Sequence, residues 1–303
     1  MCSDGRSARL ALRAWALVAV TAFGASAAPF PGESVFELRC ARGEVPVTVY
    51  RPSSWTPRSP VWVVMHGRKR NAHEYLSQWR PAADRHGALL VVPSFTKDAW
   101  PTSREYPLGD VVDAHGEALP KRDWAFPVVE RAFEEAARRA GSTHARFVLY
   151  GHGAGAQFVV RYVFFMGSGH LERAVAAGAG WYLLPDDSFA YPYGLRGTAL
   201  PESALREALA APLVLMVGLD DVRTDGILRN NEETLAQGAT RVDRARFALR
   251  RGRERARALG VPFHWRLVEV PGVGHHPGAM LPAAERVVAG SASGAAHAKP
   301  RNP

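Results

Sequence analysis

The chain has 303 residues, of which 47% are apolar and 22% charged, and its formal net charge is +9. This composition excludes a disordered protein and is sufficient for the core of one large α/β domain. The basic residues are scattered and are mostly arginine. Their densest cluster, residues 241–257, is interleaved with Asp243, alanine and leucine at helical spacing, which indicates a solvated helix face and does not favour nucleic-acid binding. The positive charge is also compatible with an anionic ligand or an anionic envelope surface.

The first 27 residues have the layout of a secretory signal peptide. Arg6, Arg9 and Arg13 precede an apolar run over residues 14–23, and residues 25–27 supply a small-residue cleavage pattern. The run is about half of the roughly 20 residues that a membrane-spanning helix needs, so no membrane span is expected. We therefore predict a periplasmic or secreted protein whose signal peptide, residues 1–27, is cleaved.

Export would leave a mature chain with one cysteine and an excess of positive charge. Cleavage removes Cys2 and leaves Cys40 alone, so no internal disulfide is expected. The leader carries three arginines and Asp4, so the mature chain keeps a net charge of about +7. The sequence indicates no oligomeric state.

Short β-branched runs alternate with helical patterns from residue 46 to residue 290, which indicates a mainly parallel sheet with helices on both faces. The predicted strands are residues 46–50, 60–65, 88–93, 145–150, 174–181, 212–218 and 263–270. The predicted helices are residues 71–86, 124–140, 154–165 and 242–259. A long turn-rich stretch, residues 94–121, is a candidate wall of a binding site. We expect one domain over residues 28–290 and a disordered tail over residues 291–303.

One turn in the middle of the chain has the pattern of a nucleophile elbow. The fourth predicted strand runs into Gly151-His152-Gly153-Ala154-Gly155, which matches G-x-S-x-G except that Gly153 replaces the serine. Such a turn requires glycine at its flanks because neighbouring backbones approach closely there. An acid and then a histidine follow the nucleophile in this arrangement, and Asp221 and His275 come after the last two predicted strands. We expect Gly153, Asp221 and His275 to converge at the carboxyl edge of the sheet.

Neighbouring residues offer alternatives for the acid and the base. Asp220 competes with Asp221, which the spacing favours. His276 competes with His275 and is expected to face solvent. His152 is expected to be a packed supporting side chain that points away from the pocket floor.

No cofactor or metal is predicted. The histidines near the sheet edge lack the H-x-x-x-H and H-E-x-x-H spacings of zinc sites; they are His66, His152, His275 and His276. Residues 151–156 also match a dinucleotide fingerprint, but they lie in mid-chain, and Glu172 precedes the next predicted strand where a ribose-binding acid should end it.

Four motifs together resemble the bacterial exported α/β hydrolases related to poly(3-hydroxybutyrate) depolymerases. They are His66-Gly67-Arg68-Lys69-Arg70-Asn71-Ala72, Gly151-His152-Gly153-Ala154-Gly155-Ala156-Gln157, Gly180-Trp181-Tyr182 and Pro271-Gly272-Val273-Gly274-His275. The resemblance extends over about residues 46–290 and implies an α/β-hydrolase fold.

The resemblance also implies roles for single residues. The backbone N–H groups of Arg68 and Ala154 would form the oxyanion hole, Asp221 would orient the histidine, and His275 would be the general base. The chain departs from the family at Gly153, because glycine has no hydroxyl and cannot form an acyl-enzyme. In serine proteases, the machinery that remains without the triad is worth about 10³ to 10⁴ over water.

Three interpretations follow from this departure. The chain can be a pseudohydrolase that binds a small-molecule or polyester-like ligand, a hydrolase in which His275 activates water, or a serine-to-glycine variant of an active enzyme. Several aromatic residues are compatible with an apolar or polyester-like ligand, although such residues also build cores and rims; they are Trp100, Tyr106, Trp181, Tyr182, Tyr191 and Tyr193.

Overall fold

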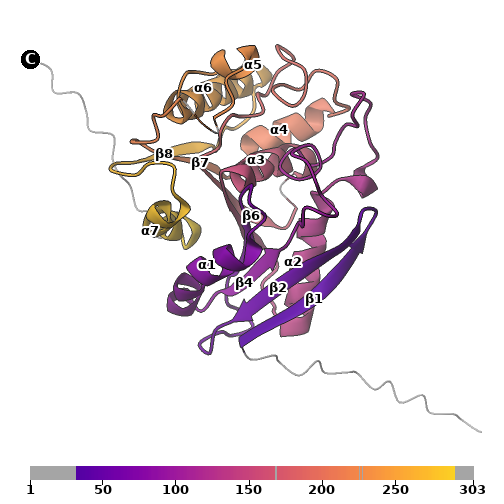
Figure 1. Ribbon diagram of the computed structural model, residues 1–303, viewed down its shortest axis with the longest axis vertical. Coiled ribbons are helices and arrows are strands. Elements are labelled where there is room, and N and C mark those ends of the chain that lie inside the picture. Colours follow the sequence, from indigo (N-terminus) through magenta and orange to yellow (C-terminus); the bar gives the residue numbers. More distant parts are fainter. Residues whose placement is uncertain (1–31, 168, 225, 227, 291–303) are drawn as a thin grey trace, which may run out of the picture.

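The computed structural model describes residues 32–167, 169–224, 226 and 228–290 (Figure 1). The predicted signal peptide and the predicted tail lie outside the described residues. No helix among the described residues is long and apolar enough to cross a membrane.

Within the described residues, eight strands form one sheet in the order β1-β2-β4-β3-β5-β6-β7-β8. The strands are β1 (Gly32–Cys40), β2 (Gly43–Arg51), β3 (Val61–Met65), β4 (Leu89–Pro93), β5 (Phe147–His152), β6 (Leu171–Ala177), β7 (Leu213–Gly218) and β8 (Arg266–Val270). The β1–β2 and β2–β4 pairs are antiparallel, and the other pairs are parallel. This mainly parallel sheet with helices on both faces confirms the predicted α/β-hydrolase fold.

Helices cover both faces of the sheet (Figure 1). They are α1 (Ala72–His86), α2 (Pro127–Ala140), α3 (Ala154–Met166), α4 (Glu202–Ala210), α5 (Glu232–Leu235), α6 (Arg241–Leu259) and α7 (Pro277–Val288), with a 3₁₀ turn, η1 (Lys121–Asp123). One buried cluster joins α1 and α7 to the sheet, and a larger one joins it to α2, α3 and α6. The central strands β3, β4, β5 and β7 are buried along their whole length, as their nearly continuous apolar sequences require.

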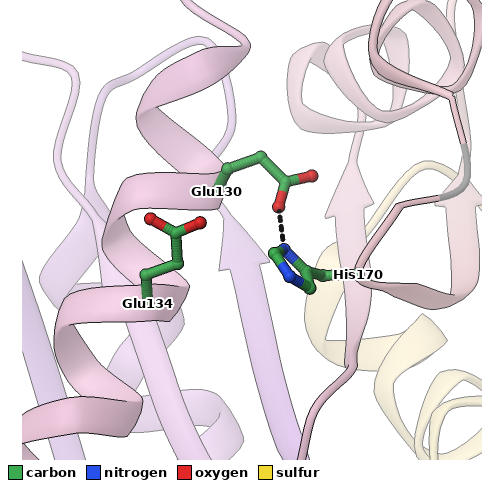
Figure 2. Close-up of side chains that lie close together, drawn as sticks. All are labelled: Glu130, Glu134 and His170. Carbon is green, nitrogen blue, oxygen red and sulfur yellow. Dashed lines mark hydrogen bonds and ion pairs between the residues drawn. The ribbon is translucent and has the colours of Figure 1, made fainter.

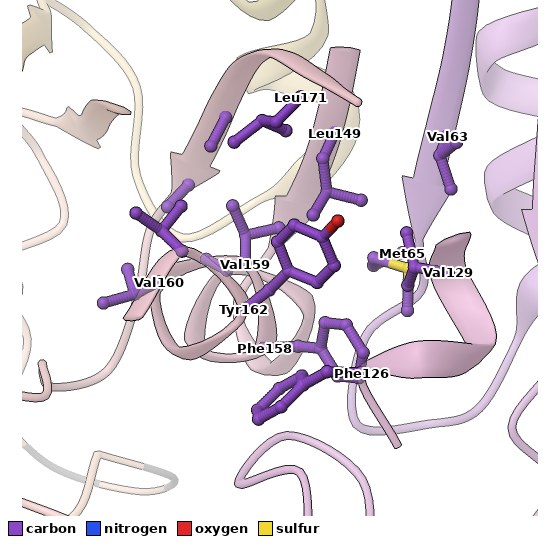
Figure 3. Packing of buried hydrophobic residues seen from close by; sticks show 14 of the residues in the cluster. Val63, Met65, Phe126, Val129, Leu149, Phe158, Val159, Val160, Tyr162 and Leu171 are labelled. Carbon is purple, nitrogen blue, oxygen red and sulfur yellow. The ribbon is translucent and has the colours of Figure 1, made fainter. Parts of the chain in front are cut away.

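Helix α3 lies at the centre of the larger cluster. Figure 3 shows Phe158 and Tyr162 of α3 beside Phe126, Met65 and Val129. The ring centroids of Phe126 and Phe158 are 4.9 Å apart in an edge-to-face arrangement, which is favourable for aromatic quadrupoles. The core therefore fixes the helix whose first turn follows the elbow.

The predicted strands differ most from the structure at β1, β6 and β8, and the other bounds agree within three residues. Strand β1 was not predicted, because it is an edge strand in which only Phe36 and Leu38 are buried. Strand β6 covers residues 171–177 rather than 174–181, because Gly178 leaves the strand with a φ of 62°. Strand β8 begins at Arg266, where its pairing with β7 begins.

Candidate active site

The elbow is a tight turn between β5 and α3. Gly153 has a φ of 60° and a ψ of −110°, a conformation that glycine adopts freely and other residues adopt with strain. A β carbon at Gly151 would lie 2.3 Å from the carbonyl oxygen of Gly155, and one at Gly155 would lie 2.6 Å from that of Met65. Both flanking glycines are therefore needed for close backbone contact, as the motif predicted.

The structure brings Asp221 and His275 together above the carboxyl edge of the sheet. The Nδ1 atom of His275 lies 2.9 Å from Oδ2 of Asp221, so this nitrogen donates and Nε2 is left to accept a proton. Nε2 lies 3.7 Å from the position that a β carbon on residue 153 would take. The carboxylate that is hydrogen-bonded to His275 is therefore that of Asp221 and not that of Asp220.

Asp221 is only 2% exposed, and its charge is stabilised by two partners. Its Oδ1 atom accepts a hydrogen bond of 2.8 Å from Nη1 of Arg241. Burial alone would raise the pKa of Asp221, but the hydrogen bond from His275 and the nearby guanidinium of Arg241 leave this pKa below its ordinary value. Asp221 is thus held as a carboxylate that orients His275.

Arg241 is a site residue that the sequence analysis missed. The cluster 241–257 was interpreted as a solvated helix face, yet Arg241 is 5% and Arg244 is 0% exposed, so the interpretation is wrong for these two. Arg241 is the first residue of α6, where the helix dipole disfavours a cation. The position of Arg241 at the start of a helix was therefore the one feature of the sequence that indicated a carboxylate partner elsewhere in the chain.

His152 is packed, but it does not face away from the cleft. It is 3% exposed, its ring centroid is 4.9 Å from that of His275, and it lines the cleft beside Gly153. Burial lowers the pKa of His152 to about 3, so the ring is neutral near pH 7. His276 is exposed, as expected, and its Nδ1 accepts from the N–H of Ala279 in the first turn of α7 at 3.2 Å.

The two residues predicted to form the oxyanion hole line the same cleft. Ala154 is the first residue of α3, so its N–H has no acceptor within the helix. This N–H belongs to the positive end of the helix dipole. Arg68 lies in the turn after β3. The side chain of Arg70 fixes this turn, because it donates to the carbonyl oxygens of Trp100 at 2.7 Å and Thr102 at 3.0 Å.

His66 is packed beneath the turn that carries Arg68. It is fully buried; Nε2 accepts from the N–H of Phe95 at 3.0 Å, and Nδ1 lies 3.1 Å from the carbonyl oxygen of Gly67, to which it donates. Burial lowers the pKa of His66 to about 4. The ring of Tyr106 stacks on His66 at 4.5 Å.

The site opens into a cleft of about 470 Å³, next to a second compartment of about 400 Å³. Both volumes suit a small ligand or one segment of a polymer. Arg68, Lys69 and Ala154 line both compartments, so the two adjoin. Of the six aromatic residues considered in the sequence, Trp181 lines the main cleft and Tyr106 lines the second compartment.

Figure 2 shows the one group of metal-ligating side chains among the described residues, which the sequence analysis did not single out: Glu130, Glu134 and His170. Glu130 bonds Nδ1 of His170 at 2.8 Å and also accepts from the hydroxyl of Tyr162. These contacts satisfy Glu130 without an ion. For the dinucleotide alternative, Glu172 is the second residue of β6, at the end of the strand far from the elbow.

A scan against protein-family models finds no match, and a search of curated proteins finds none either. Solved structures do match. The chain is 33% identical to poly(aspartic acid) hydrolase-1 from Sphingomonas sp. KT-1, with a TM-score of 0.82, over 85% of this chain and 98% of that one. It is 34% identical to a poly(3-hydroxybutyrate) depolymerase from Bordetella parapertussis, with a TM-score of 0.81, over 85% of this chain and 90% of that one.

More distant matches share the fold alone. An S-formylglutathione hydrolase from Agrobacterium tumefaciens is 14% identical, with a TM-score of 0.56, over 85% of this chain and 94% of that one. Three observations support the same family assignment. They are the mainly parallel sheet, the elbow after β5 and the level of identity to two polymer hydrolases. This chain belongs to the α/β-hydrolase family.

Proposed function

We propose that this chain is a pseudohydrolase, which binds an ester-like or apolar ligand in the cleft beside His275 and carries out no serine-based catalysis. The observation that carries the proposal is Gly153 at the apex of the elbow, with a φ of 60° and no side chain. Without a hydroxyl at this position, no covalent acyl intermediate can form there. The glycine also relieves the backbone strain that a serine at this apex would carry.

The two neighbours of about one-third identity are named for the hydrolysis of a polyester and of poly(aspartic acid). Their names favour a chain of ester or amide units as the ligand. Trp181 and the backbone of Gly153 and Ala154 line the cleft, so one repeating unit can lie against them. We propose that this recognition takes place in the periplasm or outside the cell, as the leader sequence predicts.

A second candidate function is hydrolysis by an activated water, and the bond between Asp221 and His275 favours it. Nε2 of His275 would take a proton from water, and the resulting hydroxide would attack the carbonyl carbon of an ester. The carbonyl oxygen would take the negative charge beside the N–H groups of Arg68 and Ala154. Collapse of this intermediate would expel the alkoxide, which would recover the proton from His275 to give an alcohol and a carboxylic acid.

One experiment separates these two functions. Hydrolysis of p-nitrophenyl butyrate is measured for the purified wild type and for His275→Ala, and binding of a 3-hydroxybutyrate trimer methyl ester is measured by calorimetry. The pseudohydrolase proposal expects binding without turnover above background. It also expects weaker binding in Ser103→Trp, which adds a bulky side chain at a cleft-lining position and leaves the Asp221–His275 pair unsubstituted. Turnover by the wild type that disappears in His275→Ala would replace the proposal with the water route.

A further inference from the structure

The cleft and its second compartment are lined by many cations and few anions. Among the described residues that line them, Glu74 is the one carboxylate, and it accepts hydrogen bonds from the side chains of Asn71 and Gln78. The cations are Arg68, Lys69, Arg70, Lys97, Arg229 and Arg241. Of these, Arg241 is neutralised by Asp221. The imbalance is therefore a property of the site and not only of the basic chain as a whole.

A buried arginine behind the cleft adds to this imbalance. Arg161 is 0% exposed, and its guanidinium donates to the carbonyl oxygens of Gln157 at 3.0 Å and Pro192 at 2.9 Å. Its guanidinium carbon lies 4.4 Å from the ring centre of Trp181, which lines the cleft. Among the described residues, no carboxylate is within ion-pair distance of it. Burial lowers the pKa of Arg161 to about 10, so it is still a cation at neutral pH.

A second buried arginine has the same kind of surroundings. Arg244 is 0% exposed and donates to the carbonyl oxygens of Gly180 at 2.8 Å and Arg229 at 2.9 Å. It also donates to the side-chain oxygen of Asn230 at 3.0 Å. Gly180 and Arg229 both line the cleft. Like Arg161, Arg244 has only neutral acceptors within the described part of the chain.

Buried cations held by neutral dipoles alone leave a positive potential that the fold does not cancel. Low-dielectric walls focus such a potential into the adjoining cleft, where it attracts anions. Arg229 extends it to the surface, because it is exposed and bonds the hydroxyl of Tyr193 at 2.9 Å. Lys69 lies in the turn after β3. Arg229 lies beside the segment after β6, where its guanidinium contacts the ring of Trp181. These two strands flank β5 in the sheet, so the cations lie on both sides of Gly153.

We propose that this cleft selects an anionic ligand, a chain bearing two or more carboxylates, which Lys69 and Arg229 contact on opposite sides of Gly153 while Arg161 and Arg244 stabilise its charge from behind. The inference rests on the proposed binding role of the same cleft and adds the charge of the ligand. The proposed ligand differs from an apolar one in its negative charge. A neutral chain would leave the positive potential of the cleft uncancelled.

The aromatic residues of the site favour a carboxylate chain over a single-stranded nucleic acid. Single-strand binding relies on exposed aromatic faces on which bases stack. The aromatic side chains that line the two compartments are Trp181, Tyr75 and Tyr106, and they are 4%, 4% and 0% exposed. Guanidinium groups already lie over the ring of Trp181, at 4.4 Å from Arg161 and 5.6 Å from Arg229. The site therefore offers charge without a free stacking surface.

The test compares two peptides of equal size and different charge. Acetylated and amidated tetra-aspartate and tetra-asparagine are titrated into the full wild-type chain at one ionic strength, and an eight-nucleotide thymidine strand is titrated separately. We expect tetra-aspartate to bind at least tenfold more tightly than tetra-asparagine, with an affinity that falls as salt rises. Arg229→Gln and Lys69→Gln should each weaken it about tenfold. Arg257→Gln, which removes one exposed charge near the opposite end of α6 from Arg241 and outside the two compartments, is the matched control and should change the affinity less than twofold.

Several results would overturn the inference. An equal loss in Arg257→Gln would mean that the whole surface attracts the peptide, and equal binding of both peptides would mean that the cleft does not select charge. Equal or tighter binding of the thymidine strand would overturn the carboxylate assignment. Binding of the 3-hydroxybutyrate trimer ester without any binding of tetra-aspartate would leave the pseudohydrolase proposal intact and end this one.

Discussion

The Nε2 atom of His275 lies 3.7 Å from the point at which residue 153 would carry its β carbon. A serine hydroxyl oxygen is one bond beyond that carbon, so a suitable rotamer would bring it within hydrogen-bond reach of Nε2. The Asp221–His275 pair is thus arranged around a nucleophile position that glycine leaves empty.

We therefore expect Gly153→Ser to create a working serine triad. Hydrolysis of p-nitrophenyl butyrate should rise about 10³-fold or more, because an acyl-enzyme becomes possible. Phenylmethylsulfonyl fluoride should label the variant and not the wild type, as mass spectrometry can show. The free energy of unfolding should fall by about 1 to 3 kcal/mol, since serine must adopt the φ of 60°.

The control for this prediction is Gly153→Ala, which carries the same backbone strain without the hydroxyl. It should lose stability to a similar extent and gain no activity. A folded Gly153→Ser that stays inactive and unlabelled would mean that the cleft has lost more than its nucleophile.

The sequence predicted the elbow and its two partners because strongly local signals placed them. Gly151 and Gly155 bracket a turn whose backbone contacts tolerate no β carbon, and Asp221 and His275 each follow a buried strand of a parallel sheet. Parallel strands bring such residues to one edge whatever lies between them. The order of the strands then decides which residues meet.

Long-range electrostatic partners could not be predicted in the same way. Arg161 looks like an ordinary helix arginine in the sequence, and the one signal for Arg241 was its position at the start of α6. Only the packing of α3 and α6 shows that both side chains are buried. Strand β1 was missed for a related reason, because an edge strand with one exposed face alternates too weakly to be distinguished from a polar loop. The structure was needed wherever burial, and not local pattern, defines a residue's role.

Arg241→Met should destabilise the protein by about 2 to 4 kcal/mol. The change leaves the buried carboxylate of Asp221 with His275 as its one remaining side-chain partner among the described residues, and breaking a buried ion pair from one side is costly. Urea unfolding at pH 7 measures the effect. Arg241→Met combined with Asp221→Asn should recover part of the loss, because the unpaired charge is gone; strictly additive losses in this double-mutant cycle would show that the pair contributes nothing.

Gly151→Ala should be among the most destabilising single-methyl additions in this chain. Its β carbon would lie 2.3 Å from the carbonyl oxygen of Gly155, so β5 or the first turn of α3 must shift, and we expect a loss of about 3 kcal/mol or more. Gly169→Ala is the matched control, since no atom lies within 4 Å of its added carbon, and it should change stability by less than about 0.5 kcal/mol. Equal melting temperatures for the two variants would contradict the close contact at the elbow.

The leader predicts that the mature chain begins near Ala28. Expression of the full gene product in a Gram-negative host, followed by separation of periplasm and cytosol, should place the processed protein in the periplasm or the medium. Intact-mass spectrometry then gives the amino terminus. Arg9→Glu combined with Arg13→Glu should slow export by removing the positive charge before the apolar run. Soluble cytosolic protein with an intact leader in the wild type would rule out this prediction.

The stability of the protein should fall as pH drops below 6.5, because two buried histidines resist protonation. Burial lowers the pKa of His152 to about 3 and that of His66 to about 4 in the folded state. The unfolded chain therefore binds more protons than the folded one below pH 6.5, and stability rises with pH across this window.

Each histidine should contribute a slope in the free energy of unfolding that approaches about 1.4 kcal/mol per pH unit between pH 6 and pH 5. Urea unfolding at half-unit intervals measures the slope, and His152→Phe should reduce it by roughly one histidine's share, since an aromatic ring is kept and the titrating group is removed. His73→Phe, which replaces an exposed histidine on α1, is the control for the loss of one imidazole. A slope that is equal in His152→Phe and in the wild type would show that His152 takes up its proton as readily in the folded protein as in the unfolded chain.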